Sequence, residues 1–191
     1  MQTIQTAGAA EQTINKSRFY AWAAACKTEQ EVGSFLRAIA AQHPTAHHLA
    51  YAFRIKTDDG LGNHFIVPRF SDAGEPSGTA GKPILQMLEG QQLINVCVAV
   101  IRYYGGINLG TGGLAHAYGG TAKMALQAAQ IVDFVEMQEI SLTVDYNQLD
   151  SLLHAVEQYK GAVLDKVFAQ QVSVKINLPV QQSQALLNRF G

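Results

Sequence analysis

The sequence predicts an α+β fold in two domains, residues 1–135 and 136–191. Strand-like and helix-like segments follow one another, but without the regular βα repeats of a parallel sheet. The residue pattern of the sequence changes near Val135, after a long segment rich in glycine and alanine. Beyond that point the predicted order is β-α-β-β-α, a split βαβ unit that lacks its last strand.

Composition and charge limit the class of protein. The chain has 191 residues, of which 48% are hydrophobic and 15% are charged, as in an ordinary globular protein. A net charge of −1 gives no overall attraction to nucleic acid or membranes, so any basic surface must be local. The N-terminus lacks the features of a signal peptide, and Cys26 and Cys97 have no CxxC partner. We therefore expect a cytoplasmic protein with buried thiols and no membrane partner.

The first domain is predicted to contain four strands and three helices. Thr28 and Glu31 form a capping box that starts the first helix. Thr79 is the expected N-cap of the second helix, which closes at Gly90. A run that is apolar on both faces except at Arg102 predicts a central strand covered by helices on both sides. The predicted strands are 13–26, 49–56, 64–70 and 94–104, with a turn at 57–63, and the third helix covers 111–130.

The second domain begins with a strand at 140–146, in which apolar and polar residues alternate. Asn147 is the expected N-cap of the next helix, which ends at Gly161. In a ferredoxin-like order the missing strand would lie beside 140–146, so this edge is expected to be open. The remaining predicted elements are a hairpin, 162–169 and 172–178, and a last helix, 180–190.

Two glycine-rich loops, 74–81 and 105–113, each lead directly into a predicted helix. Glycine lets the backbone approach a partner closely, and a helix start offers unpaired N–H groups with a partial positive charge. Such loops favour an anion. The alternative, which stays open, is that the glycines only permit sharp turns and tight packing. Each glycine within the third helix lowers the stability of that helix by about 1 kcal/mol relative to alanine, and close packing or a bound group must offset this loss. These glycines are Gly112, Gly113, Gly119 and Gly120.

The common cofactor and metal motifs are not matched. Proline replaces the Ser or Thr that a P-loop needs after Lys82, and the glycine spacing also fails. Residues 110–115 match GxGxxA with Asp133 about twenty residues on, but the strand ends too early for a dinucleotide site. No cysteine or carboxylate is spaced to complete a metal site with the histidines at 43–48. The sequence therefore predicts no cofactor and no metal.

Charge is distributed unevenly around the glycine loops. No acidic residue lies between Glu89 and Asp133, whereas Arg102 does. Such a surface suits phosphate or an acidic partner, although a packed helix with few charges gives the same pattern. Asp72 and Glu75 lie at the first loop, where we favour capping of backbone N–H groups over an acid–base pair. Lys123 also lies within the stretch without acidic residues, and the basic residues expected to converge on it are Arg18, Arg54, Lys56, Arg69 and Lys82.

The predicted binding face consists of the two loops and the polar residues around them, and no catalytic residue is assigned. Tyr104 is included because a tyrosine at a strand end can stack on a base, although packing is the commoner role. The candidate binding residues are Arg54, Arg69, Asp72, Glu75, Ser77, Gly78, Thr79, Gly81, Lys82, Arg102, Tyr104, Gly105, Gly106, Gly110, Thr111, Gly112 and Gly113.

Five longer motifs are KSRF at 16–19, GEPSGTAGKPIL at 74–85, RYYGG at 102–106, LGTGGL at 109–114 and AYGG at 117–120. With these motifs the chain resembles the IMPACT family, whose bacterial members are YigZ-type proteins. The resemblance implies an N-terminal ribosomal-protein-domain-2-like fold, which a small-subunit ribosomal protein shares with domain IV of elongation factor G. It also implies a C-terminal ferredoxin-like domain, similar to the last domain of that factor. The missing last strand of this sequence departs from that layout, so the domain is expected to be truncated.

The resemblance also implies a role in translation, because family members with known roles resemble regulators of translational control that bind a partner protein. We favour a non-enzymatic binding protein that engages RNA, the ribosome or a translation-factor protein through the glycine-loop face. The alternative is an enzyme acting on a small phosphorylated or otherwise anionic substrate, with Asp72 and Glu75 as acid–base candidates. In a third, purely structural interpretation, the glycines serve only to allow close packing.

Overall fold

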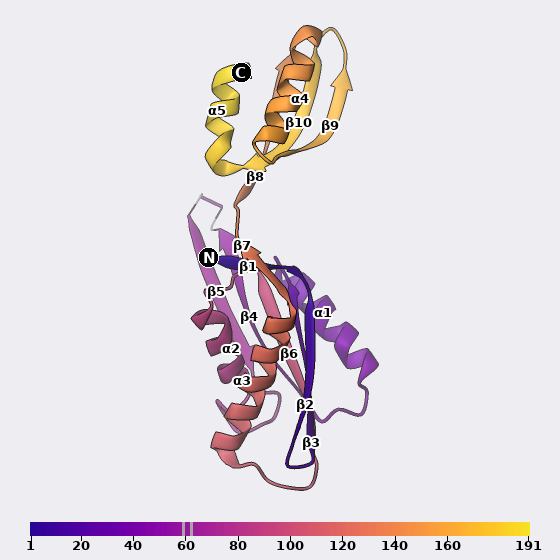
Figure 1. Ribbon diagram of the computed structural model, residues 1–191, viewed down its shortest axis with the longest axis vertical. Helices are drawn as coiled ribbons and strands as arrows, with labels where there is room; N and C mark the ends of the chain where they lie inside the picture. Colours follow the sequence, from indigo (N-terminus) through magenta and orange to yellow (C-terminus); the bar gives the residue numbers. More distant parts are fainter. Residues whose placement is uncertain (59, 62) are drawn as a thin grey trace. The chain divides into compact units, whose positions relative to one another are not determined.

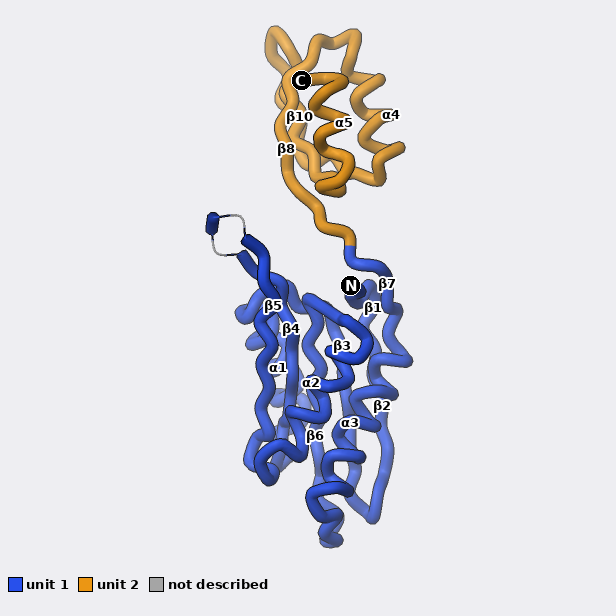
Figure 2. The backbone as a smooth tube through the Cα atoms, turned by 90° about the vertical axis from the view of Figure 1, so that its left-hand side faces the viewer, with its two compact units in different colours: residues 1–134 blue, residues 135–191 orange. Residues whose placement is uncertain are grey.

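The computed structural model describes residues 1–58, 60, 61 and 63–191. Its contacts fall into two compact units, Met1–Phe134 and Val135–Gly191 (Figure 2). Each unit combines a main antiparallel sheet with helices, so the predicted mixed α and β architecture is confirmed. The turn predicted at 57–63 includes residues 59 and 62, which lie outside the described residues.

A five-stranded antiparallel sheet in the order β2-β3-β6-β4-β5 forms the framework of the first unit (Figure 1). β6 is its central strand, and its residues from Val96 to Arg102 are all buried, which explains why this run is apolar on both faces. The strand bounds are Gly8–Ile14 for β2, Ser17–Ala25 for β3, His48–Asp58 for β4, His64–Ser71 for β5 and Val96–Tyr103 for β6.

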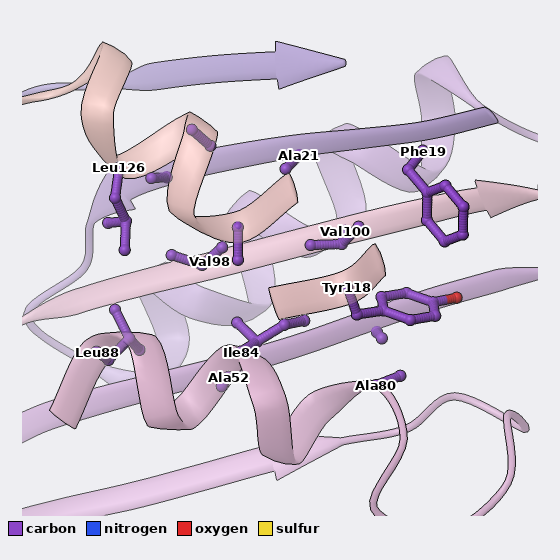
Figure 3. Packing of buried hydrophobic residues seen from close by; sticks show 14 of the residues in the cluster. Phe19, Ala21, Ala52, Ala80, Ile84, Leu88, Val98, Val100, Tyr118 and Leu126 are labelled. Atoms are coloured by element: carbon purple, nitrogen blue, oxygen red, sulfur yellow. The ribbon is translucent and has the colours of Figure 1, made fainter. Parts of the chain in front are cut away.

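Helices cover both faces of this sheet. α2 (Gly81–Gly90) and α3 (Gly110–Ala128) cover one face, and α1 (Glu29–Gln42) packs against the other. The interface between these two helices and the sheet, shown in Figure 3, contains many alanines. Their small side chains allow the helix and sheet backbones to approach closely. The residues labelled there are Phe19, Ala21, Ala52, Ala80, Ile84, Leu88, Val98, Val100, Tyr118 and Leu126.

Around α1, the predicted buried thiols are confirmed, whereas the predicted capping box is confirmed only at Thr28, because the carboxylate of Glu31 accepts a hydrogen bond from the backbone N–H of Lys27. The side chain of Thr28 accepts a hydrogen bond from the backbone N–H of Glu31 at 3.1 Å and so caps the helix. Cys26 and Cys97 are buried free thiols in the apolar cluster that contains Val32 of α1. Both predictions depend only on residues close in sequence or on local hydrophobicity.

The predicted strand 13–26 is confirmed as β3 over Ser17–Ala25, but its start is wrong because the chain reverses at 15–16. Asn15 and Lys16 have positive φ angles of 45° and 65° and form the turn between β2 and β3. Two further strands, β1 (Gln2–Thr6) and β7 (Gln130–Asp133), pair antiparallel and are absent from the sequence prediction. This pairing joins the two ends of the first unit, so local periodicity does not reveal it.

The second unit has the element order β-α-β-β-α that the sequence predicts. Its sheet order is β8-β10-β9, which places β8 at one edge of the described sheet. The predicted cap Asn147 is wrong, because Asp145 and Gln148 form a capping box around a 3₁₀ turn that precedes α4. The bounds are Met137–Val144 for β8, Tyr146–Gln148 for η1, Leu149–Gln158 for α4, Ala162–Phe168 for β9, Val172–Pro179 for β10 and Val180–Phe190 for α5.

Gly8→Ala and Gly112→Ala are expected to change the stability of the first unit in opposite directions. A Cβ at Gly8 would lie 2.2 Å from the carbonyl oxygen of Ala125, so β2 and α3 must separate, at a cost of about 1–3 kcal/mol. At Gly112 no described atom lies within 4 Å of the added Cβ, so alanine should stabilise α3 by about 1 kcal/mol. Urea unfolding followed by the fluorescence of Trp22, the only tryptophan of the sequence, measures both. A Gly8→Ala protein as stable as the unmodified protein would contradict the packing role of Gly8.

Candidate functional site

The first glycine-rich loop folds around the carboxylate of Asp72. This carboxylate accepts hydrogen bonds from the backbone N–H groups of Gly78, Ala80 and Gly81, at 2.8, 3.0 and 2.8 Å. These groups were expected to bind an external anion, but the protein's own carboxylate already occupies them. The capping role predicted for Asp72 is confirmed, and the anion site predicted at this loop is wrong.

The other predicted binding residues of the first loop do not form an anion site there. Thr79 does not cap α2, because its hydroxyl donates to a carbonyl within the loop at 2.6 Å and the helix begins at Gly81. A Cβ at Gly81 would lie 2.5 Å from the carbonyl oxygen of Ser71, so this glycine permits a tight contact between α2 and β5. The candidates of this loop that face solvent are Ser77 and Lys82.

Glu75, unlike Asp72, is buried and binds side chains. Its carboxylate accepts hydrogen bonds from Nη1 of Arg102 at 2.9 Å and from the hydroxyl of Tyr118 at 2.8 Å. The side chains of Arg102 and Glu75 are only 7% and 4% exposed. The backbone-capping role predicted for Glu75 is therefore wrong. An acid–base pair with Asp72 is not supported either, because the two carboxylates serve separate sets of partners.

Arg102 connects this ion pair to the start of β3 and to the second loop. Its Nη2 donates to Oγ of Ser17 at 3.4 Å, and the same oxygen accepts a hydrogen bond from the backbone N–H of Gly105 at 3.2 Å. Burial, followed by the charge of Glu75, raises the pKa of Tyr118 well above its usual range, so its hydroxyl remains a donor. We call Ser17, Glu75, Arg102 and Tyr118 the Arg102 network.

The second glycine-rich loop is open at its centre. α3 begins at Gly110, and no side chain of the described residues caps its N-terminus. A Cβ at Gly106, Gly110 or Gly112 would have no described neighbour within 4 Å, so these positions border free space. Gly105 differs, since a Cβ there would lie 2.1 Å from the carbonyl carbon of Lys16. The loop thus combines one packing glycine with an accessible helix start.

A cavity of about 330 Å³ joins the start of α3 to the Arg102 network. Arg102 and Glu75 both line it. Among the described residues, Nε of Arg102 is the one fully buried side-chain nitrogen or oxygen without a hydrogen-bond partner. An incompletely satisfied cation and a helix N-terminus thus share one cavity, a combination that suits an anion. The other lining residues are Pro76, Asn108, Leu109, Gly110, Thr111 and Leu114.

Two predicted basic residues do not reach this cavity. Arg54 donates to the carbonyls of Leu88 and Leu93, at 3.4 and 2.9 Å, near the far end of α2. Arg69 lies within 3.6 Å of a carboxylate oxygen of Glu29, at the start of α1. Their predicted convergence on the loops is therefore wrong, because strand register and alternation direct them elsewhere.

Tyr104 lies beside the second loop. It is 48% exposed, its hydroxyl donates to Asn108 at 3.1 Å, and the guanidinium carbon of Arg102 lies 5.1 Å from its ring centroid. The predicted residues that the structure brings to the second loop and its cavity are Glu75, Arg102, Tyr104, Gly105, Gly106, Gly110, Thr111, Gly112 and Gly113.

Comparison with known proteins assigns the family. The sequence profile of the Impact N-terminal domain matches residues 15–126, and that of a domain of unknown function (DUF1949) matches residues 142–190. This chain belongs to the IMPACT family. An IMPACT family member of Haemophilus influenzae is 36% identical over 92% of this chain and 83% of the relative. The IMPACT family member YigZ of Escherichia coli is 36% identical over 87% of this chain and 79% of the relative.

A solved structure is similar to this chain over nearly its whole length. The crystal structure of a hypothetical protein matches with a TM-score of 0.68 and 31% identity, over 97% of this IMPACT chain and 88% of that chain. Within the described residues, no helix is long and apolar enough to cross a membrane. The same part of the chain holds no group of three or more His, Cys, Asp or Glu placed to bind a metal ion.

Sequence reasoning missed two members of the Arg102 network, Tyr118 and Ser17. Both lie within motifs that the chain shares with the IMPACT family, AYGG and KSRF. Their hydrogen bonds connect positions 43 and 85 residues apart in the chain, so no local pattern relates them to their partners. The motifs were therefore the only sequence signal that could have identified them.

Asp72→Ala is expected to destabilise the first unit by about 0.5–2 kcal/mol at neutral pH, the usual cost of losing a cap. Burial of Asp72 alone would raise its pKa, but hydrogen bonds from the loop amides outweigh this and hold the pKa below its ordinary value of 3.8. The stabilisation is therefore present above pH 3.8 and lost as the pH falls through the lower folded value. Urea unfolding at neutral and acidic pH tests this. A difference in the free energy of unfolding between variant and unmodified protein that does not change with pH would contradict it.

Glu75→Gln is expected to destabilise the first unit by about 3–5 kcal/mol, because it leaves the buried guanidinium of Arg102 without its counter-charge. Tyr118→Phe removes one hydrogen bond to a charged group and should cost about 1.5–3 kcal/mol. The double variant Glu75→Gln/Arg102→Gln should lose less than the sum of its single variants. Urea unfolding of the unmodified protein, Glu75→Gln, Arg102→Gln and the double variant measures the coupling energy. Strict additivity of the two single losses would argue against a direct pair.

Proposed function

We propose that this IMPACT family protein is a non-enzymatic, translation-associated regulatory protein that binds RNA through its second glycine-rich loop, 105–113. Family membership supports the link to translation, through the role that the resemblance implies. The structure supports this loop over the first one, because Asp72 already occupies the amides of the first loop.

One observation carries the proposal: the uncapped start of α3 and the cation of Arg102 share an open cavity. The exposed positions Gly110, Thr111 and Gly112 form the first turn of the helix. A phosphate at this turn would accept hydrogen bonds from the helix amides and interact favourably with the helix dipole. Phosphate contacts of this kind position an RNA without reading its sequence.

The alternative, an enzyme acting on a small anionic substrate, has less support. Its acid–base candidates were Asp72 and Glu75. The first accepts hydrogen bonds from three backbone amides, and the second is held by Arg102 and Tyr118. Both carboxylates thus stabilise the fold, which favours binding over catalysis at this cavity.

Gly112→Glu tests the proposed loop. A glutamate in the first turn favours the helix through its dipole, so the variant should fold. Its charge would lie where the phosphate is expected, and like charges about 4 Å apart repel by about 1 kcal/mol even in water. We therefore expect the affinity for RNA at low salt to fall about fivefold or more. Fluorescence anisotropy of labelled RNA and co-sedimentation with ribosomes measure the change.

Two control variants separate charge from other effects. Gly112→Gln adds a similar side chain without charge, and Gln127→Glu adds the same charge near the other end of α3. Both should bind like the unmodified protein. Unchanged binding of RNA and ribosomes by Gly112→Glu would overturn the proposal. Ribosome binding that weakens while RNA binding does not would indicate a protein partner instead.

A further inference from the structure

An aromatic patch lies on the face of the central sheet opposite the glycine loops. Phe19 and Arg102 are register partners and face α2 and α3, whereas the adjacent register pair, Arg18 and Tyr103, faces the other way. That other face is the one on which α1 packs. The aromatic patch is defined by Arg18, Tyr20, Trp22, His43 and Tyr103.

The rings of the aromatic patch lie close enough to form one surface. Tyr20 and Trp22 stack with centroids 6.4 Å apart and planes 20° apart. His43 lies 5.1 Å from Trp22, and its Nδ1 is 2.9 Å from the hydroxyl oxygen of Tyr103. Tyr20 meets Tyr103 edge-on at 5.9 Å. These mutual contacts restrict the side chains, which lowers the entropy lost when a ligand binds.

The aromatic patch lies at the border of the core and not within it. Its four aromatic residues are half-buried, whereas Ala99 and Ile101 beneath α1 are fully buried. Next to the patch, a shallow cavity of about 190 Å³ opens on β2 and β3, and Arg18 and Tyr20 line it. Tyr20 therefore borders open space on the β2 side.

The charges beside the aromatic patch favour a polyanion. Arg18 is exposed, and its guanidinium carbon lies 5.3 Å from the ring centroid of Tyr103. Lys16, in the turn before β3, is also exposed. Glu11, the register partner of Tyr20, is the single acidic residue among the described residues that line the cavity. Arg18 and Glu11 balance each other at the cavity, so the additional positive charge next to the patch comes from Lys16 in the adjacent turn.

We propose that the aromatic patch binds single-stranded RNA, with bases stacked on its rings and Arg18 at the phosphate backbone. Aromatic side chains on an antiparallel sheet are a known platform for unpaired bases, and a nearby cation adds the electrostatic attraction; here the half-buried rings lie at the border of the face that α1 covers. A duplex keeps its bases paired and cannot stack them on these rings. The inference goes beyond the loop site and does not rest on it, because the two surfaces lie on opposite faces of the sheet.

Trp22 provides a direct test, because it is the only tryptophan in the sequence and belongs to the aromatic patch. We expect a short oligouridylate to quench its fluorescence saturably, with an affinity that falls as salt increases. Inorganic polyphosphate carries the same charges without bases and should leave the fluorescence nearly unchanged. A double-stranded RNA of equal length should quench it far less than the single strand.

Variants then locate the contact, with anisotropy of labelled oligouridylate as the readout. Tyr20→Leu should weaken binding about fivefold or more, whereas Tyr20→Phe keeps the ring and should retain binding. Arg18→Gln, at an exposed position, should weaken binding and reduce its dependence on salt. Phe70→Leu removes an exposed aromatic ring of β5 and serves as the matched control.

Each outcome decides the inference. Quenching by oligouridylate that Tyr20→Leu and Arg18→Gln weaken, and that Phe70→Leu does not, supports it. An absence of quenching, equal quenching by polyphosphate, or equal loss in Phe70→Leu would overturn it. Gly112→Glu should leave the quenching intact, so a failure of the loop proposal and a failure at the aromatic patch can be distinguished.

Discussion

The buried ion pair between Glu75 and Arg102 is the interaction on which the rest of the first unit depends. Arg102 is the one charged residue of the central strand, and a buried charge is costly unless it is paired and hydrogen-bonded. Glu75 comes from the first loop, Tyr118 from α3 and Ser17 from the start of β3. These segments and β6 must therefore meet around one ion pair, and this requirement fixes both glycine loops against the sheet.

The two glycine loops have similar compositions but opposite physical roles. Asp72 precedes the first loop and places a carboxylate on the amides of that loop. The stretch between Arg102 and Gly110 contains no acidic residue, and Glu75, which lines the same cavity, is bound by Arg102 and Tyr118 and not by the amides of this loop. Glycine composition alone therefore says little about whether a helix start is free. The nearest carboxylate in the sequence is the better indicator.

The features that could be predicted from the sequence are those encoded locally. The Thr28 cap, the central strand and the capping role of Asp72 each depend on neighbouring residues or on a hydrophobic run. The turn at Asn15 and Lys16 escaped prediction because non-glycine residues rarely adopt positive φ. The Arg102 network could not be derived, because its bonds span 27 to 85 residues and depend on strand register.

Strand alternation explains how one short segment can serve two surfaces. Arg102 and Tyr103 are consecutive residues at the end of β6, yet they face opposite sides of the sheet. The loop cavity and the aromatic patch therefore share a rigid support without sharing a contact residue. A substitution at Arg102 would disturb this support and affect both surfaces, so it cannot separate their functions. Exposed positions such as Gly112 and Arg18 can, because each belongs to one surface and neither is part of the buried core.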